Sequence, residues 1–473
     1  MKYNKIWLLV LLVILVSCNK FLDVTPKNVI SMNDMESIKK SLAGYLYNVK
    51  ERGGANSLPW TPFEGVEATI VNYTDEWDLS HWGDKELTDD VIGRLDWKDE
   101  GTASRWNTLY TGIGFMNLLL NESSTAEGSE QLRDIVRGEV FMHRAYNFLK
   151  LVQYFSPYKN NDLGVPLSIE TYKDFFQVSL KRGKQIEVYH QIIKDLDEAA
   201  ACLKRTPPSP GYNILYSEDI LYRLYARVYH YKAASGAAEQ DDWKNAALFA
   251  GKATANRILE SNPAKLKDVF DCAKVALTND PESGFRLRYN IYGLYNIYHA
   301  DKQPSVSYYT QLYGNNDIRK TMFYSETTPL PSLSITVNKY NYLGVNEQSI
   351  YVSPLFRLAE AFLIKAEALA MSDDLNGAID ALTTFKKARY TGVIDVPATK
   401  NELLQEVYKE RKREFVFEGD MRWLDMKRMG ESYERTVGGR TFKLEKDDWR
   451  YTFMIPYAEI ENNKEISQNP GWL

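Results

Sequence analysis

Two stretches of the chain repeat one sequence plan, and this repetition restricts the possible folds more than any other feature. Residues 218–260 contain the run LYRL, an Ala-rich helical segment, the turn DWKNAA and a second helix. Residues 354–390 follow the same order, with the run LFRL, an Ala-rich segment and the turn DLNGAI. Small residues fall where the two helices of each stretch would cross, and they let antiparallel helices approach closely. Each stretch is therefore predicted to be a pair of packed helices.

Pairs of antiparallel helices joined by a short turn are typical of the tetratricopeptide (TPR) repeat. The periodicity of apolar residues predicts further helices before the first pair. These helices cover residues 35–50, 104–120, 132–154 and 186–203. We therefore expect a mostly α-helical fold on a scaffold of TPR-like helix pairs, although the two copies do not form an uninterrupted array.

Two long stretches lack the helical period and are expected to be loop-rich insertions in the helical scaffold. Residues 51–102 contain a Gly-Gly step, prolines and several tryptophans, and they are expected to hold little regular structure. Residues 265–350 are irregular and rich in tyrosine. The chain has 32 tyrosines and 10 tryptophans, which is more than its core requires. We expect some of these rings to form a contact surface.

The first residues have the organisation of an export signal. Lys2 and Lys5 precede an apolar run that is too short to span a membrane comfortably, and residues 1–17 are predicted to be a signal peptide. The run LVSC that ends at Cys18 resembles the bacterial lipobox. This resemblance implies cleavage before Cys18 and its acylation, and two or three acyl chains anchor a protein stably. The alternative is an ordinary secretory signal with a coincidental cysteine.

The stretch from Glu402 to Gly430 combines a dense run of charges with large apolar residues. Its first half has the helical period, Gly419 interrupts it, and a second short helix is expected after the glycine. Three interpretations are open: a solvated helix face, a helix pair with partly buried Arg–carboxylate pairs, and a catalytic set of acids. Catalysis is the least favoured, because acids that lie beside bases stay ionised.

Templates of known enzymes and metal sites are absent from the sequence, so we expect no catalytic activity, no cofactor and no metal. The 5 histidines are scattered, and neither a Cys-x-x-Cys pair nor a P-loop occurs. A formal net charge of −5 argues against nucleic acid as the main partner. Cys202 and Cys272 lack the spacing of a disulfide framework and are expected to be free buried thiols.

Several motifs together resemble the SusD/RagB family. A helix with the run HRAY leads to GVPL within residues 137–167, and FRLAE at 356–360 resembles a second family helix. The most specific match is ERKREFVFEGDMRWLDMKR at 410–428. Residues 454–472, with MIPYAEI and a final QNPGW, match the C-terminal pattern. With the lipobox at Cys18, the resemblance covers nearly the whole chain in the expected order.

The resemblance implies an outer-membrane lipoprotein of Bacteroidota in which residues 18–473 form a single SusD-like domain. Such proteins bind an oligosaccharide and deliver it to a SusC-like TonB-dependent outer-membrane transporter, on which they act as a lid. Relatives in the RagB branch bind peptides, so a peptide or another nutrient is the alternative cargo. The implied location is the outer membrane, with the lipid anchor at Cys18 and the protein facing the cell surface.

Rings and polar groups in the two insertions are the candidates for ligand contact. Pyranose rings stack on Trp and Tyr, and their hydroxyls bond to polar side chains. The candidates in the first insertion are Tyr73, Asp75, Trp77, Trp82 and Trp97. Those in the second are Tyr292, Tyr295 and Tyr298, in a segment that also holds Tyr289, Tyr308, Tyr309 and Tyr313. The alternatives are tryptophans packed under loops or against the transporter, and a helical core or interface stripe for the tyrosines spaced by three.

The resemblance also favours an architectural role for the charged stretch. It implies that six charged residues brace this helix pair against the TPR-like pairs through partly buried ion pairs. These residues are Arg411, Arg413, Glu414, Glu418, Arg422 and Asp425.

Overall fold

The computed structural model describes most of the chain after the leader. It covers residues 32–50, 70, 73–78, 87–98, 103–171, 180–209, 213–271, 282–292, 303–304, 306–327, 334–337, 339, 343–345 and 348–472. Several predictions fall outside these residues. They are the signal peptide, the lipid anchor at Cys18, the ligand candidates Trp82, Tyr295 and Tyr298, and the thiol of Cys272.

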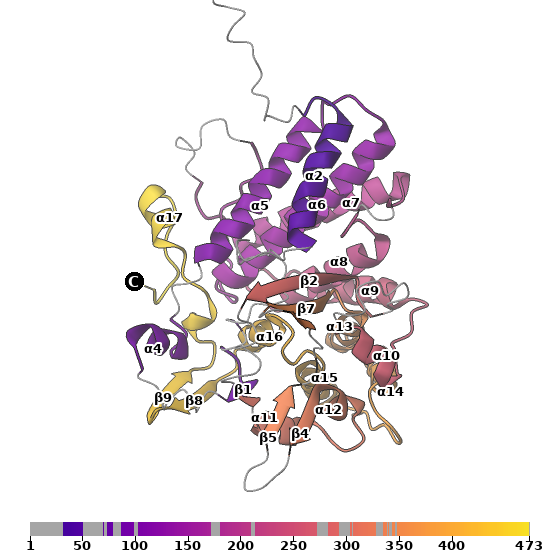
Figure 1. The fold of residues 1–473 in the computed structure, drawn as a ribbon, viewed down its shortest axis with the longest axis vertical. Helices are drawn as coiled ribbons and strands as arrows, with labels where there is room; N and C mark the ends of the chain where they lie inside the picture. The colour runs from indigo at the N-terminus through magenta and orange to yellow at the C-terminus, as the bar shows by residue number, and fades with distance from the viewer. Residues whose placement is uncertain are drawn as a thin grey trace, which may run out of the picture.

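Long helices form one end of the molecule. They are α2 (Met35–Lys50), α5 (Ala103–Glu122), α6 (Glu130–Phe155) and α7 (Gln185–Arg205), and α6 packs against the other three (Figure 1). The start of α6 is fixed by Ser129, whose side chain accepts a hydrogen bond from a backbone N–H in the first turn. All four helices were predicted from the apolar period, with ends that differ by a few residues at most.

The two repeated stretches are helix pairs, as predicted. The first pair is α8 (Glu218–Lys232) and α9 (Asp242–Thr254), and the second is α13 (Leu358–Met371) and α14 (Leu375–Lys387). Although about a hundred residues of sequence separate them, α9 packs directly on α13. Their contact is built from small residues, because Ala226, Ala246, Ala250, Ile364 and Ala368 form one buried cluster. The TPR-like stack is therefore continuous in space.

The charged stretch forms two helices, α15 (Lys400–Glu414) and α16 (Met421–Met429). The turn between them holds Phe417 at a φ of 59° and Gly419 at 54°, and α16 ends at Gly430 with a φ of 59°. A positive φ is unusual for phenylalanine, so this turn needs support from its surroundings. The prediction of a helix, a break at Gly419 and a second short helix is confirmed.

The second insertion holds more regular structure than the sequence analysis predicted. Strand β2 (Phe285–Tyr292) pairs antiparallel with β7 (Gln348–Leu355), and β6 (Leu343–Val345) pairs with the other edge of β7. The interpretation of Tyr289 and Tyr292 as a helical stripe is therefore wrong. The sequence FRLRYNIY alternates apolar and polar residues, which is the period of a strand, and the spacing of the tyrosines by three concealed it.

The remaining elements are short. In the first insertion they are β1 (Trp77–Asp78) and an unpredicted helix α4 (Asp89–Leu95). In the second they are α10 (Pro263–Asp268), β3 (Gln303–Pro304), α11 (Val306–Leu312), α12 (Ile318–Phe323), β4 (Tyr324–Thr327) and β5 (Ser334–Val337). The C-terminal segment adds β8 (Tyr433–Val437), β9 (Arg440–Leu444), a 3-10 turn at Trp449–Tyr451 and α17 (Tyr457–Asn462).

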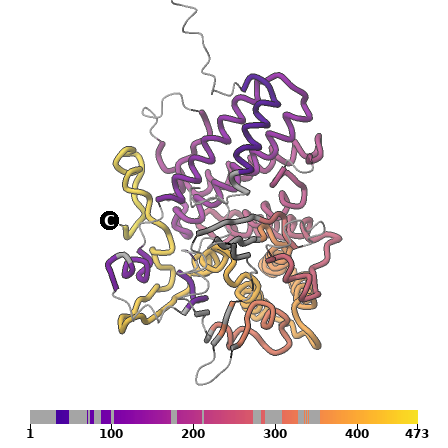
Figure 2. Tube along the Cα trace, in the orientation of Figure 1, coloured from indigo at the N-terminus to yellow at the C-terminus, as the bar shows by residue number. Residues whose placement is uncertain are grey.

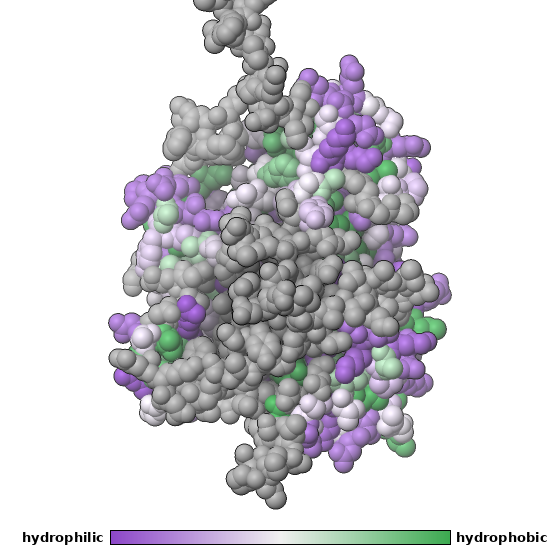
Figure 3. All heavy atoms as spheres, viewed as in Figure 1, coloured by the Kyte–Doolittle hydropathy of each residue, from purple (hydrophilic) through white to green (hydrophobic). Residues whose placement is uncertain are grey.

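The C-terminal segment runs along one side of the molecule, and α4 lies beside it at the outer edge (Figure 2). Arg435 of β8 joins the two, because its guanidinium donates to the backbone carbonyl of Leu95 at 2.6 Å. On the face drawn in Figure 3, the described side chains are hydrophilic along the outer edges, and hydrophobic ones occur in small separate groups. No helix within the described ranges has the length and hydrophobicity needed to cross a membrane.

Candidate functional site

A short strand pairing brings the two insertions together. Strand β1 pairs antiparallel with β3, so that Trp77 lies opposite Pro304 and Asp78 lies opposite Gln303. The two segments that sequence analysis assigned to ligand contact are thus neighbours in space, although more than two hundred residues separate them. The segment Tyr73–Asp78 also contacts α16, through Trp423 and Arg422.

Three of the candidate rings are packed into the core. Tyr73, Trp77 and Trp97 are only 2–3% exposed. Tyr73 lies 5.5 Å from the ring of Trp423, and Trp77 lies 4.5 Å from the ring of Phe417. The indole N–H of Trp97 donates to the carbonyl of Tyr73 at 2.8 Å, and the guanidinium of Arg435 lies 4.1 Å above its ring. In this conformation the three rings hold the first insertion to the helices.

The tyrosines of α11 and its end also have structural partners. The hydroxyl of Tyr308 donates to the carbonyl of Lys412 at 3.1 Å, and that of Tyr313 donates to the carbonyl of Arg413 at 2.7 Å. These carbonyls belong to the last turn of α15, where a helix leaves backbone acceptors without intrahelical partners. Tyr292 is the last residue of β2, opposite Gln348. The contact of any of these tyrosines with a ligand stays a prediction.

Asp75 is joined to the charged stretch. Its two carboxylate oxygens accept hydrogen bonds from the Arg422 guanidinium at 2.7 and 2.8 Å, and Arg422 also pairs with Glu431 at 2.6 Å. The ammonium of Lys412 lies 3.5 Å from Asp75. Burial alone would raise the pKa of Asp75, but Arg422 and Lys412 outweigh it and lower this pKa to about 2. Asp75 is therefore ionised at neutral pH and committed to this ion pair.

Glu76 is a functional candidate that sequence analysis did not identify. Its carboxylate is buried, and it accepts from the backbone N–H of Phe417 at 2.9 Å and from the hydroxyl of Thr74 at 3.0 Å. It thereby supports the unusual turn between α15 and α16. Burial raises the pKa of Glu76 to about 7, and the charge of Asp75 acts in the same direction. No sequence signal distinguished this acid from the other polar residues of its segment.

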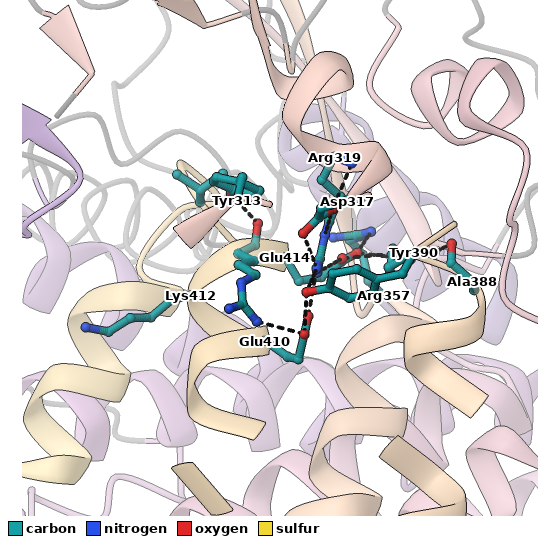
Figure 4. A network of polar contacts seen from close by, with 12 residues as sticks. Tyr313, Asp317, Arg319, Arg357, Ala388, Tyr390, Glu410, Lys412 and Glu414 are labelled. Atoms are coloured by element: carbon teal, nitrogen blue, oxygen red, sulfur yellow. Dashed lines mark hydrogen bonds and ion pairs between the residues drawn. The ribbon is translucent and has the colours of Figure 1, made fainter. Parts of the chain in front are cut away.

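Glu414, at the end of α15, is the centre of a buried network of ion pairs (Figure 4). Arg389 donates to it through two nitrogens at 2.9 and 3.0 Å, Arg319 donates at 3.1 Å, and Arg357 also bonds to it. Burial alone would raise the pKa of Glu414, but the three arginines outweigh it and hold the pKa well below its ordinary value. This acid is therefore a structural anion.

Two further acids on the same helix and turn extend the network. Glu410 accepts from Arg319 at 2.7 Å and from the Tyr390 hydroxyl at 2.6 Å. Glu418 accepts from Lys339 and from Arg357, both at 2.6 Å. Burial lowers the pKa of Lys339 to about 8, against the opposing charge of Glu418. The hypothesis of buried ion pairs is confirmed for the charged stretch.

The partners of the network come from several parts of the chain. Arg357 precedes α13 and Arg389 follows α14, so both attach α15 to the second helix pair. Arg428 of α16 pairs with Glu367 within α13. Asp425 pairs with Arg411 at 2.7 Å. The predicted bracing against the TPR-like pairs is present for Glu414 and Glu418. It is wrong for the other four residues: Arg411 and Asp425 pair with each other, Arg413 pairs with Glu410, and Arg422 pairs with Asp75. The network also fastens the second insertion through Arg319 and Lys339.

The one described cysteine and the acid clusters show no sign of a reactive or metal-binding centre. Cys202 is a free, buried thiol, as expected, and burial raises its pKa to about 11. Within the described ranges, no group of three or more His, Cys, Asp or Glu side chains is placed to hold a metal ion. What the site offers is a set of rigidly fixed loop segments on a helical support.

Together, the stacked TPR-like helix pairs and the loop-built region braced by buried ion pairs define the class: a helical scaffold that carries two inserted, loop-rich segments. Two family models match the chain. One, described as starch-binding and associating with the outer membrane, matches residues 20–230. The other, described as the SusD family, matches residues 222–472. The chain belongs to the SusD/RagB family.

Similar proteins agree with this assignment. The starch-binding protein SusD of Bacteroides thetaiotaomicron is 34% identical over 125 residues, which are 25% of this chain. The match spans only 21% of the length of that relative. A SusD-like protein of Bacteroides fragilis superposes with a TM-score of 0.71 at 16% identity, over 94% of this chain and 98% of the other.

A SusD-like carbohydrate-binding protein of Bacteroides vulgatus gives a TM-score of 0.68 at 18% identity, over 92% and 97% of the two chains. At such identities the solved structures establish the shared fold, and the prediction of a SusD-like, mostly helical architecture is confirmed.

Proposed function

We propose that this protein binds an oligosaccharide at the outer membrane and delivers it to a SusC-like TonB-dependent transporter. The observation that carries this proposal is the match to family models that together span residues 20–472, one of them described as starch-binding and outer-membrane associated. Solved relatives of the same fold include proteins described as carbohydrate-binding. The lipid anchor at Cys18 is part of the proposal.

The region around β1 and β3 supports the proposal physically. It joins the two insertions that hold the candidate residues, and its described parts are fixed by buried contacts. A binding site with fixed walls loses little conformational entropy when a ligand binds. Trp82, Tyr292, Tyr295 and Tyr298 are the candidates for stacking on sugar rings. Tyr73, Trp77 and Trp97 position the segments that carry them.

A second candidate function is the binding of a peptide or another nutrient as a lid of such a transporter. The observation that favours it is the burial of Tyr73, Trp77 and Trp97, since these rings offer no open face for stacking on a sugar. Short peptides would instead bind through backbone hydrogen bonds, which need no aromatic platform.

Affinity electrophoresis tests both candidates. A soluble form that lacks residues 1–18 retains every residue the structure describes, and it is run in native gels that contain neutral polysaccharides such as starch, xylan or mannan. We expect retardation by at least one of them, and loss of that retardation in Trp82→Ala. Trp243→Ala is the matched control, because Trp243 is half-buried on α9 of the first helix pair, outside both insertions.

The control should migrate like the unmodified protein, and melting curves should show that both variants are folded. Migration that no polysaccharide changes, together with binding of a peptide mixture in calorimetry, would support the peptide lid instead. Trp77→Ala is less informative, because the loss of its packing on Phe417 also destabilises the fold.

A further inference from the structure

An open pocket of about 500 Å³ lies at the opposite end of the molecule from the long N-terminal helices. Its walls come from α11, from α12 with the turn before it, from the start of β4, and from Thr391 after α14. Among the candidate ligand residues whose side chains the structure describes, Tyr73, Asp75, Trp77 and Trp97 are all absent from its lining. The volume is within the range of about 300–1,000 Å³ that is usual for small-molecule sites.

Backbone hydrogen bonds hold the two main walls together. The N–H of Ile318 donates to the carbonyl of Arg389 at 3.0 Å, and the N–H of Thr391 donates to the carbonyl of Asn316 at 2.8 Å. The turn before α12 is thereby fixed to the end of the second helix pair. The shape of the pocket does not depend on side-chain contacts alone.

The ion-pair network forms the support beneath this pocket (Figure 4). Asp317 lines the pocket and receives the Arg319 guanidinium at 2.8 and 2.9 Å. Arg319 is completely buried and continues to Glu410 at 2.7 Å and Glu414 at 3.1 Å. The acids of the family signature thus fix the position of a pocket wall. A site held in this way is organised before its ligand arrives.

Five of the eleven described lining residues carry uncharged amide or aliphatic hydroxyl side chains, and the rings of Tyr309 and Tyr324 add apolar surface. Amides and hydroxyls are contributed by Asn315, Asn316, Thr321, Ser325 and Thr391. These groups include both donors and acceptors, which is what the hydroxyls of a sugar require. Among the described lining residues, Ile318 is the one apolar aliphatic side chain. The pocket is therefore more polar than a typical site for a drug-like molecule.

The charges in the lining balance each other. Arg319 neutralises Asp317, which leaves Lys320 and Glu326 as one cation and one anion. The ammonium of Lys320 bonds to Asn315 at 3.3 Å, and the carboxylate of Glu326 accepts from the Tyr309 hydroxyl at 2.7 Å. An anionic or cationic ligand would find no net opposite charge here. A neutral ligand with many hydroxyls fits this lining best.

We propose that this pocket binds a neutral saccharide, as a second contact point for the glycan that the protein captures. The choice of a saccharide rests on the proposed function, whereas the rigidity, polarity and charge balance of the pocket do not. A second contact on one chain raises the effective local concentration of the ligand and so strengthens binding to the whole protein.

Hydrogen exchange measured by mass spectrometry locates the bound ligand. The probes are malto-, xylo- and manno-oligosaccharides, added to the soluble form that lacks residues 1–18. With a probe that binds, we expect slower exchange in peptides that cover residues 314–326 and 388–391. At saturating probe the same slowing should persist in Trp82→Ala, because the described lining of the pocket includes no residue of the first insertion.

Thr321→Trp fills the pocket from an exposed position, and we expect it to weaken binding of the probe about tenfold in calorimetry. Thr384→Trp is the matched control, an exposed threonine on α14 outside the pocket, and it should bind normally. If Thr321→Trp does not fold, Glu326→Gln takes its place, because glutamine keeps the acceptor for Tyr309 and removes one charged ligand contact.

Two results would overturn the inference, and only the second of them also overturns the proposed function. A probe that binds with unchanged affinity to Thr321→Trp, with slowed exchange confined to the β1–β3 region, refutes the pocket and leaves the proposed function intact. Failure of every probe to bind at any position refutes both the pocket and oligosaccharide binding.

Discussion

Asp75 and Arg422 are 347 residues apart in the sequence, and they form a two-pronged ion pair with donor–acceptor distances of 2.7 and 2.8 Å. This pair attaches the first insertion to the second of the two helices in the charged stretch. Because both oxygens of the carboxylate are used, the geometry of the segment Tyr73–Asp78 is specified as well as its position.

The Asp75–Arg422 pair should stabilise the fold in a pH-dependent way. The pKa of Asp75 is lowered from 3.8 to about 2, so its contribution is fully present above about pH 4 and is lost as the pH falls through 2. A lowering of this size corresponds to about 2 kcal/mol. Urea titrations should show Asp75→Asn less stable than the unmodified protein at pH 6, with a difference that shrinks toward pH 2.

Asp241→Asn is the control for that titration, since its partner Lys244 and Asp241 itself are both exposed. Surface pairs of this kind contribute little, so this variant should match the unmodified protein at every pH. An Asp75→Asn deficit that stays constant down to pH 2 would contradict the assignment of its cost to the ion pair.

Glu76 should act in the opposite direction. Its pKa is raised from 4.5 in the unfolded chain to about 7 in the folded protein. The free energy of unfolding therefore falls as the pH rises from 4.5 to 7, and this loss is constant above pH 7. Glu76→Gln keeps an acceptor for the N–H of Phe417 without the charge. We expect it to equal the unmodified protein near pH 4.5 and to exceed its stability at pH 8, by up to about 3 kcal/mol.

Thermal melting at pH 4.5 and pH 8 measures this difference. Glu434→Gln, at an exposed position of β8, should show no such change between the two pH values. A Glu76→Gln variant that is destabilised at pH 8 would show that the carboxylate charge itself supports the turn at Phe417.

Glu418→Ala should weaken the fold without changing the ligand affinity of the folded protein. The substitution leaves Lys339 without its carboxylate partner and removes one of the acids that neutralise Arg357, both of them buried. Removal of one member of a buried ion pair typically costs about 3–5 kcal/mol. The free energy of unfolding from urea titrations checks the first part, and calorimetry with a bound oligosaccharide checks the second.

Glu461→Ala, an exposed acid on α17, provides the comparison and should change neither quantity. If Glu418→Ala loses affinity for the oligosaccharide but keeps the free energy of unfolding of the unmodified protein, the charged stretch becomes a candidate for direct ligand contact.

Cys18 should carry the lipid that anchors the protein. Cells grown with radiolabelled palmitate should yield a labelled protein, and the label should be absent from Cys18→Ala. Cys202→Ala is the control, because this thiol is buried and should leave the label unchanged. Equal labelling of unmodified protein and Cys18→Ala would refute the lipobox, and no label in either would favour an ordinary secretory signal.

The transporter partnership predicts a stable complex in the membrane. Extraction of outer membranes in a mild detergent, followed by affinity purification of a tagged protein, should also recover a TonB-dependent barrel of the SusC type. Recovery of the protein alone under those conditions argues against the partnership, while glycan binding by the soluble form would be unaffected.

The helical scaffold was predictable from the sequence because its information is local. The apolar period defines α2, α5, α6 and α7, and small residues at crossing positions define the two helix pairs. The charged stretch could be assigned to buried ion pairs because its acids and bases alternate with large apolar residues. Its partners could not be named, since Arg319, Lys339, Arg357 and Arg389 are brought to it only by the tertiary fold.

The insertions were harder to predict because an aromatic ring in a loop can either pack into the core or contact a ligand. Trp77 and Trp97 lie in segments with little helical or strand pattern, yet both are buried against residues more than 300 positions away. Glu76 was overlooked because an acid in a loop is usually exposed. The pocket beside α12 was not predicted, since its residues come from separate segments, although Tyr309 in its wall belongs to the tyrosine-rich segment proposed for ligand contact.

The two ends of the long second insertion lie side by side, in addition to the contacts that its middle makes with the helical stack. Strand β2 pairs with β7 from Phe285 opposite Leu355, and the N–H of Leu358 bonds to the carbonyl of Glu282. The two ends of the insertion are therefore tied together next to the start of α13. Between these ends, the chain can gain or lose residues without displacing α9 from α13. Such an arrangement can support an insertion of a different length on the same helical stack.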